Sequence, residues 1–147
     1  MLARYIDFEV RGDELGWLIA LEAERNIPFP IRRAYYIFGT RPGVRRGRHA
    51  HRTLQQIMIC IAGECRVLLD NGAATEDLRM HRNDRGLVLE PMIWHEMYDF
   101  SPDCVLMVLA DAWYEEAEYI RSYSAFKAAC AVGGAHGAQP PPDPPSR

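Results

Sequence analysis

Short runs in which apolar and polar residues alternate recur along most of the chain, and Gly, Pro, Asn and Asp interrupt them. A period of two places neighbouring side chains on opposite faces of a strand, so each run predicts a half-buried β-strand. The spacing of these strands, about 8–12 residues, is typical of a β-sandwich or a barrel. The expected strands are Tyr5–Val10, Leu15–Glu22, Ile31–Phe38, Gln56–Ile61, Cys65–Leu69, Thr75–Met80, Leu87–Glu90, Trp94–Phe100 and Cys104–Ala110.

Turn-forming residues mark the connections between these strands. We expect a turn at Arg11–Glu14 and a loop at Gly39–Gly47. The runs on either side of Ala62–Glu64 are expected to pair as a hairpin, and Asp70–Gly72 is a strong turn signal.

Helical structure is expected only near the C-terminus. One or two turns are predicted in Tyr114–Ile120, and a short helix in Ser124–Val132. The remaining residues, 133–147, consist largely of Gly, Ala and Pro and include His136. Such a segment buries too little apolar area to offset its ordering entropy, so we expect a single domain over residues 1–132 followed by a disordered or extended tail.

Composition narrows the function classes. The chain has 147 residues, 48% hydrophobic and 25% charged, which is the mix of an ordinary globular domain. Its net charge of −3 argues against a nucleic-acid partner. No apolar stretch reaches the ~20 residues of a membrane span, and no signal-peptide pattern is visible. Three cysteines lie in apolar runs and are expected to be buried free thiols, which favours the cytoplasm: Cys60, Cys65 and Cys104.

Candidate chemistry gathers around two histidines, His49 and His51, at the entrance to the strand Gln56–Ile61. Both imidazoles should point the same way, because side chains two positions apart on a strand share a face. Titratable rings rimmed by guanidinium groups predict a pocket for a small anion, since arginine grips phosphates in bidentate fashion. Solvated surface arginines and hydrogen-bonded barrel histidines are the alternatives. The arginines near the pair are Arg41, Arg45, Arg46, Arg48 and Arg52.

The spacing of this region is G-x5-H-x-H-x4-Q-x6-G, and it resembles the first motif of the cupins, which has a glutamate where this chain has glutamine. The segment Glu90–His95 resembles the second cupin motif, with Met92 in place of its glycine. The resemblance implies an all-β fold, a cupin or double-stranded β-helix (jelly-roll) barrel. The residues on the first motif are Gly43, His49, His51, Gln56 and Gly63.

In most cupins, three histidines and the glutamate bind a divalent metal, and His49, His51 and His95 match those histidines. Gln56 offers only a neutral amide oxygen, which is a poorer ligand for a dication than a carboxylate. We therefore expect a site without metal or other cofactor, although three histidines can still hold Zn or Fe. Imidazoles free of metal titrate near neutrality and can exchange protons with a bound molecule.

A closer resemblance covers about residues 5–126. The chain is similar to the sugar-nucleotide 3,4-ketoisomerases, which act on dTDP-4-keto-6-deoxy-D-glucose. The resemblance implies a metal-independent homodimer whose 3-keto product passes to a PLP-dependent aminotransferase for 3-amino-3,6-dideoxy sugars. Family members can carry arginine at the position of His95, which leaves His49 and His51 as the catalytic pair. The similar segments are Arg33–Phe38, Arg45–His51, Cys65–Asp70, Gly86–Pro91, Trp94–Phe100 and Tyr119–Tyr123.

A shift of the ketone from C4 to C3 needs groups that titrate near pH 7 and a donor for the enediolate oxygen. We assign His51 as the main base, His49 as its partner acid or shuttle, and Tyr35 as the donor. Strand parity lets only one of Tyr35 and Tyr36 face the pocket, and Tyr35 is preferred. Further substrate contacts are expected from Arg41, Arg46, His95 and Trp17, and Trp17 and Trp94 are each candidates either for stacking on thymine or for the core.

Other readings stay open. The chain could be a metal-dependent cupin enzyme, a non-catalytic sugar-nucleotide-binding module, or a 3,5-epimerase, whose reaction also starts at the acidic carbon beside the C4 ketone. The strand Tyr5–Val10 is expected to add to a neighbour's sheet edge and give a strand-exchanged homodimer, because an unpaired edge is a liability. The gluco or galacto configuration of the product at C4 does not follow from the sequence.

Overall fold

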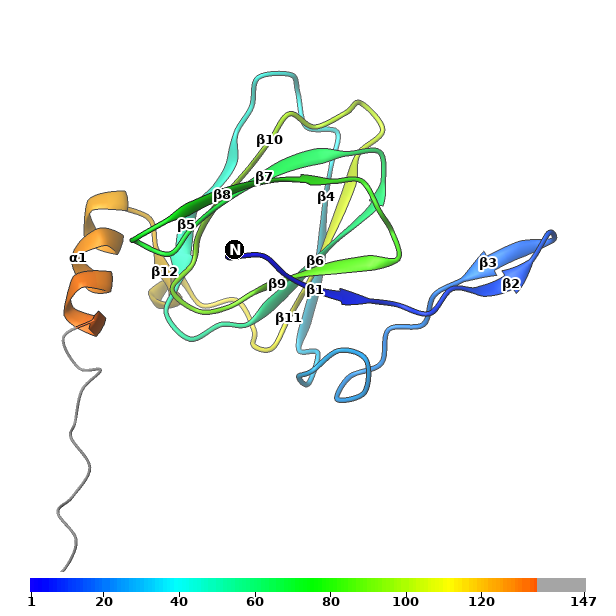
Figure 1. The fold of residues 1–147 in the computed structure, drawn as a ribbon, viewed down its shortest axis with the longest axis horizontal. Coiled ribbons are helices and arrows are strands. Elements are labelled where there is room, and N and C mark those ends of the chain that lie inside the picture. The colour runs from blue at the N-terminus through cyan, green and yellow to red at the C-terminus, as the bar shows by residue number, and fades with distance from the viewer. Residues whose placement is uncertain (135–147) are drawn as a thin grey trace, which may run out of the picture.

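The structure is a computed structural model and describes residues 1–134 (Figure 1). Two five-stranded antiparallel sheets face each other and form the expected all-β cupin barrel. The first sheet has the order β1 (Arg4–Asp7), β9 (Arg85–Leu89), β6 (Gln56–Ala62), β11 (Val105–Ala110) and β4 (Arg33–Phe38). The second has the order β12 (Tyr119–Ile120), β5 (Arg46–His51), β10 (Trp94–Tyr98), β7 (Cys65–Asp70) and β8 (Thr75–Met80).

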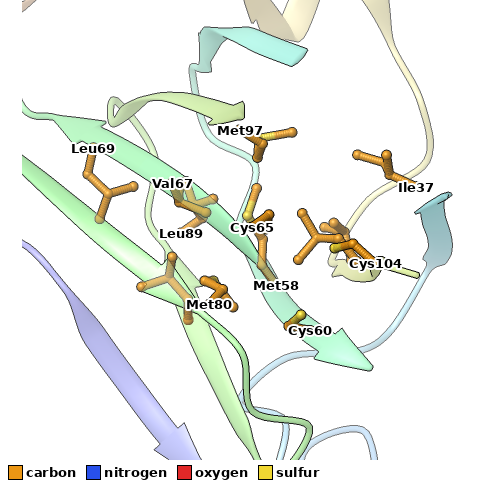
Figure 2. Packing of buried hydrophobic residues seen from close by; sticks show 13 residues of the cluster. Ile37, Met58, Cys60, Cys65, Val67, Leu69, Met80, Leu89, Met97 and Cys104 are labelled. Atoms are coloured by element: carbon orange, nitrogen blue, oxygen red, sulfur yellow. The ribbon is translucent and has the colours of Figure 1, made fainter. Parts of the chain in front are cut away.

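Strand β6 shows why its sequence is an almost unbroken apolar run. Met58 and Cys60 point into the barrel and join the cluster that fills it (Figure 2). Ile57 and Ile59 point outward and are covered by a second cluster, in which Phe8 of the N-terminal segment takes part. A strand buried on both faces needs apolar side chains at odd and even positions alike. The expected buried free thiols are confirmed, and they belong to Cys60, Cys65 and Cys104.

The seven strands expected between Ile31 and Ala110 are all present, but one expected pairing is wrong. Strands β6 and β7 do not form a hairpin, because β6 lies in the first sheet and β7 in the second. Residues Ala62–Glu64 turn the chain from one sheet to the other, with Gly63 at φ 63°. A Cβ at Gly63 would lie 2.4 Å from Ser101 Oγ, so a glycine is required at this corner. Strand β7 pairs instead with β8, across the expected turn at Asp70–Gly72.

The N-terminal part differs most from expectation. Arg11–Asp13 (β2) and Gly16–Leu18 (β3) form a hairpin that projects from the barrel (Figure 1), where we expected a turn followed by the strand Leu15–Glu22. Asp13 Oδ1 accepts a hydrogen bond from the backbone N–H of Leu15 at 2.9 Å, which places the turn two residues later than expected. Strand β1 pairs with β9 of its own chain, so in this arrangement it fills an edge of its own sheet.

The C-terminal segment closes one side of the barrel. A 3-10 turn, η1 (Glu116–Glu118), precedes the two-residue strand β12, and helix α1 (Tyr123–Gly134) follows. Phe126 of α1 is fully buried against Trp94 and Ile120. Helix α1 includes two of the residues assigned to the tail, and the rest of the tail prediction, including His136, lies outside the described residues. No helix within residues 1–134 is long and apolar enough to cross a membrane.

Candidate functional site

The two histidines lie at the end of their own strand, β5, and not at the entrance to β6 as expected. This strand was not predicted from the sequence, because its arginines and glycine show no apolar alternation. The strand is also irregular, with Gly47 at φ 78° and Arg48 at φ 59°. The expectation that both imidazoles share a face is confirmed: the ring centroids of His49 and His51 are 4.8 Å apart.

The register of the second sheet adds two more rings to this pair. His95 of β10 lies opposite His49, and Tyr119 of β12 lies opposite His51. The centroid of His95 is 4.6 Å from that of His49 and 5.5 Å from that of His51. Strands β5 and β10 approach closely at Gly47, where a Cβ would lie 2.9 Å from the carbonyl oxygen of His95. The missing side chain at Gly47 is therefore part of how the rings are brought together.

The opposite wall comes from the first sheet. Gln56 is fully buried, and its Nε2 donates a hydrogen bond to the Tyr35 hydroxyl at 3.0 Å. Tyr35 is half-buried and packs against the barrel cluster, whereas Tyr36 is 64% exposed. Both tyrosines border the pocket, so the expectation that only one of them could do so is wrong, and the choice of Tyr35 rests on its burial and its bond to Gln56. Burial raises the pKa of Tyr35. Its phenol therefore stays protonated at neutral pH and can donate a hydrogen bond.

Between these walls lies an open pocket of ≈ 510 Å³. His49 and His95 line it from β5 and β10, and Tyr35 lines it from β4. Arginines border the pocket, as predicted from the sequence, but of the five predicted ones only Arg45 and Arg46 do so. Arg46 lines the pocket and makes no ion pair within residues 1–134, whereas Arg45, also at the pocket, is bound to Glu96 at 2.7 Å.

Two expected substrate contacts lie outside this pocket. Arg41 is in an exposed loop and is not among the lining residues. Trp17 is 71% exposed on the β2–β3 hairpin and borders a separate apolar groove of ≈ 560 Å³. Trp94 is buried and belongs to the core under α1, which excludes it as a stacking platform.

Three further residues near the histidines were not predicted from the sequence. Tyr119 and Arg121 line the pocket from β12 and the segment that follows it. Arg33, on β4, has buried Nε and Nη2 atoms without a hydrogen-bond partner among the described residues, and its guanidinium carbon lies 5.3 Å from the Tyr35 ring centroid. No motif spacing marks these residues, because their place depends on which strands become neighbours.

Burial keeps the imidazoles neutral. It lowers the pKa of His49, and it lowers the pKa of His51 to about 4 together with the neighbouring His49 and Arg33. The pKa of the fully buried His95 is also far below its ordinary value, again mainly because burial disfavours the charged ring. Both ring nitrogens of His51 and Nδ1 of His49 lack a hydrogen-bond partner within the described chain. Neutral rings with unpaired nitrogens are free to accept a proton from a bound molecule.

The same three rings are the residues that could hold a metal ion. One nitrogen from each of His49, His51 and His95 lies within 4.8 Å of the others. Nδ1 of His95 is 3.2 Å from the carbonyl oxygen of Ile93, which leaves its Nε2 as the free ligand atom. Gln56 stands in the place of the cupin glutamate. Its Nε2 donates to Tyr35, and its Oε1 has no hydrogen-bond partner among residues 1–134. The donor set fits a metal only in part, since it carries no negative charge.

Comparison with known proteins decides the family. The model of the family FdtA, described as WxcM-like, C-terminal, matches residues 1–131. The chain belongs to the FdtA family. A curated relative, TDP-4-oxo-6-deoxy-alpha-D-glucose-3,4-oxoisomerase from Aneurinibacillus thermoaerophilus, is 47% identical over 124 residues, which are 84% of this chain and 89% of the relative.

Solved structures agree with this FdtA-family membership. A 3,4-ketoisomerase from Helicobacter canadensis superimposes with a TM-score of 0.85 at 39% identity, covering 89% of this chain and 98% of that one. The sugar 3,4-ketoisomerase QdtA from Thermoanaerobacterium thermosaccharolyticum, determined in complex with TDP, gives a TM-score of 0.88 at 34% identity and covers 90% and 98% of the two chains. The resemblance to sugar-nucleotide 3,4-ketoisomerases is thereby confirmed.

Proposed function

We propose that this protein converts dTDP-4-keto-6-deoxy-D-glucose into the 3-keto-6-deoxy sugar nucleotide by metal-independent proton transfer through an enediol. One observation carries the proposal: the neutral imidazole of His49 lines an open pocket together with Tyr35, and the His51 ring, whose nitrogens have no partner within residues 1–134, lies 4.8 Å from it. The relatives support the substrate class, since one is named for this keto sugar and another was determined with TDP.

The reaction moves hydrogen and leaves the oxidation level of the whole sugar unchanged. In the substrate, C3 carries a hydrogen and a hydroxyl, and C4 is the ketone. His51 takes the proton from C3, and the electron pair of the broken bond forms the C3–C4 double bond. The negative charge moves to O4, which the Tyr35 hydroxyl stabilises as a hydrogen-bond donor and then protonates to give the enediol.

The second half reverses these steps on the neighbouring carbon. The hydroxyl at C3 gives its proton to the Tyr35 phenolate, which restores the phenol, and the C3 ketone forms. The electron pair of the C3–C4 double bond takes a proton at C4 from His49, which receives it from His51 as acid or shuttle. No electrons leave the sugar, so the residues at the site suffice without a redox cofactor. A positioned acid or base contributes roughly 10²–10⁴-fold in rate, and an oriented oxyanion donor roughly 10²–10³-fold.

Substrate binding is assigned to the rim of the pocket. Arg46 is free of a carboxylate partner within the described residues, so its guanidinium is available for the diphosphate, and Arg41 lies outside the pocket in the loop that precedes β5. A contact to the sugar is assigned to His95 because it belongs to the pocket wall. Trp17 lies on the projecting hairpin and does not line the histidine pocket of its own chain. It would contact a nucleotide only in the pocket of a neighbouring subunit.

We also propose a homodimer. The outer face of the first sheet exposes Phe38 (67%) and Ile61 (41%), and the β2–β3 hairpin exposes Trp17. Apolar side chains gathered in this way mark a protein interface. In a strand-exchanged dimer, β1 would pair with β9 of the neighbouring subunit through the same contacts that it makes with β9 of its own chain. Sedimentation should give a dimer that Phe38→Glu weakens, and a monomer at all concentrations would contradict the proposal.

The product points to the next reaction. A ketone at C3 is a carbonyl that a PLP-dependent aminotransferase converts into an amine, so we place the enzyme before such a step, in the cytoplasm. Incubation of the product with an aminotransferase of this kind and an amino donor should yield a 3-amino sugar nucleotide. Recovery of the keto sugar alone would contradict this placement.

Proton NMR tests the main proposal. Purified protein and dTDP-4-keto-6-deoxyglucose should give the 3-keto isomer, and the configuration at C4 of the product can be read from the same spectra. His51→Asn should abolish turnover, and His81→Asn, the same change at an exposed histidine outside the site, should not. Unchanged substrate with the wild-type protein would refute the proposal.

A second candidate is a metal-dependent cupin enzyme, which the close approach of His49, His51 and His95 favours. Elemental analysis separates the two. Stoichiometric Zn or Fe, together with activity that a chelator removes and the metal restores, would establish the second candidate in place of the first.

A further inference from the structure

Tyr119 contacts both imidazoles of the proposed catalytic pair. Its ring centroid lies 4.8 Å from that of His49 and 4.5 Å from that of His51, and the planes are inclined by 57° and 69°. Inclined and T-shaped arrangements at this distance are the favourable ones for aromatic rings. The contact follows from the register of β12 on β5, which places Tyr119 directly opposite His51.

Other contacts hold Tyr119 in place. The guanidinium carbon of Arg121 lies 4.5 Å from its ring centroid, and Glu116 accepts two hydrogen bonds from Arg121, at 2.7 and 3.0 Å. The strand itself is fastened where the Glu118 carboxylate accepts a hydrogen bond from the backbone N–H of Leu54 at 2.9 Å. The ring of Tyr119 can leave the histidines only if several of these contacts break.

Hydrogen bonds do not orient His51, because neither ring nitrogen has a partner within residues 1–134. Its orientation depends on packing against the rings of Tyr119, His49 and His95. A base that must meet a particular C–H bond is sensitive to its placement, and a displacement of 1 Å costs about 100-fold in rate.

We infer that Tyr119 is a positioning residue, whose ring holds His49 and His51 in the orientation that proton transfer requires. The inference rests on the proposed function, since the proton transfer is that of the ketoisomerase reaction. It assigns the task to the ring face and not to the phenol hydroxyl. Replacing the ring should therefore lower kcat and leave KM nearly unchanged, because the groups assigned to the substrate stay in place.

Two substitutions at this position separate ring from hydroxyl. Tyr119→Phe keeps the ring and should retain kcat within about two-fold, whereas Tyr119→Leu should lower kcat by about 10- to 100-fold. Tyr123→Leu is the matched control. The ring of Tyr123 packs against Trp94 at 5.3 Å and 76°, so this change also removes an aromatic contact, but away from the histidines. It should leave kcat unchanged.

A readout independent of substrate completes the test. The ring signals of His49 and His51 in NMR spectra of the free protein should keep their dispersion in Tyr119→Phe and lose it in Tyr119→Leu. The inference is overturned if Tyr119→Phe loses as much activity as Tyr119→Leu, or if Tyr119→Leu keeps the kcat and histidine spectra of the wild type. A wild-type protein without turnover would refute the proposed function alone, and the spectra would still decide the role of Tyr119.

Discussion

Lowering the pH from 7.5 to 5.5 should leave kcat/KM nearly unchanged, because the proposed base His51 stays neutral over this range. Its pKa is lowered to about 4, first by burial and then by His49 and Arg33. An imidazole with a pKa of about 4 is about 97% neutral at pH 5.5, whereas one with the ordinary value of about 6.5 is only about 9% neutral there. The ordinary value would therefore cost about ten-fold in rate.

The assay is the initial rate of isomerisation by NMR at low substrate concentration, from pH 4.5 to 8.5 at constant ionic strength. Under these conditions kcat/KM reports the protonation of the free enzyme. Circular dichroism at each pH shows whether the protein is folded. A ten-fold fall that inflects near pH 6.5, in protein that is still folded, would refute the assignment of a buried neutral base.

A substitution near the base sharpens this prediction. Arg33→Met removes a cation that lowers the pKa of His51, so the acidic limb should move to higher pH. The limb should stay well below the ordinary pKa of histidine, since burial is the larger cause of the lowered pKa and remains in the variant. Arg25→Met, at an exposed arginine that pairs only with Glu22 among the described residues, is the matched control and should leave the limb in place.

The remaining predictions concern the walls of the pocket. Tyr35→Phe should lower kcat by about 10²–10³-fold through loss of the oxyanion donor, and Tyr36→Phe, at the more exposed tyrosine that borders the same pocket, should stay within about two-fold; equal effects in steady-state kinetics would contradict the choice of Tyr35. Gly47→Ala should destabilise the fold by about 1–2 kcal/mol more than Gly43→Ala in urea unfolding, because the two glycines have similar φ angles but only Gly47 faces a carbonyl oxygen at 2.9 Å. Gln56→Glu should gain tight Zn²⁺ binding, measured by elemental analysis, and lose isomerase activity; a metal-free, active variant would count against the role given to the glutamine.

Local patterns predicted the barrel strands and the shared face of His49 and His51 because both depend on short-range periodicity. They failed where the partner of a strand matters. The apolar runs around Gly63 are compatible with a hairpin or with a corner between sheets, and only the packing of two sheets decides between them. The strand β5 was not predicted because its sequence lacks apolar alternation, and it forms by pairing with β10 on one side and β12 on the other.

The candidate site shows the same division. The histidines followed from a motif, whereas strand parity did not choose between Tyr35 and Tyr36, and the burial of Tyr35 in the folded chain distinguishes them. Tyr119 is far from them in sequence and enters the site through one strand pairing, so no local pattern could place it. Trp17 was expected to contact the substrate, but it lies on a hairpin that projects from its own barrel. It could contact a substrate only in the pocket of a second chain.

The central claim is that imidazoles move hydrogen between neighbouring carbons of the sugar without a metal. The most direct measurement is isomerisation in D₂O by chelator-treated protein whose metal content has been measured. We expect a 3-keto product formed at the rate of untreated protein, with deuterium at C4 to the extent that the imidazole proton exchanges with D₂O before it is returned. Substrate that keeps its C3 hydrogen, or turnover that returns only when a divalent metal is added, would contradict it.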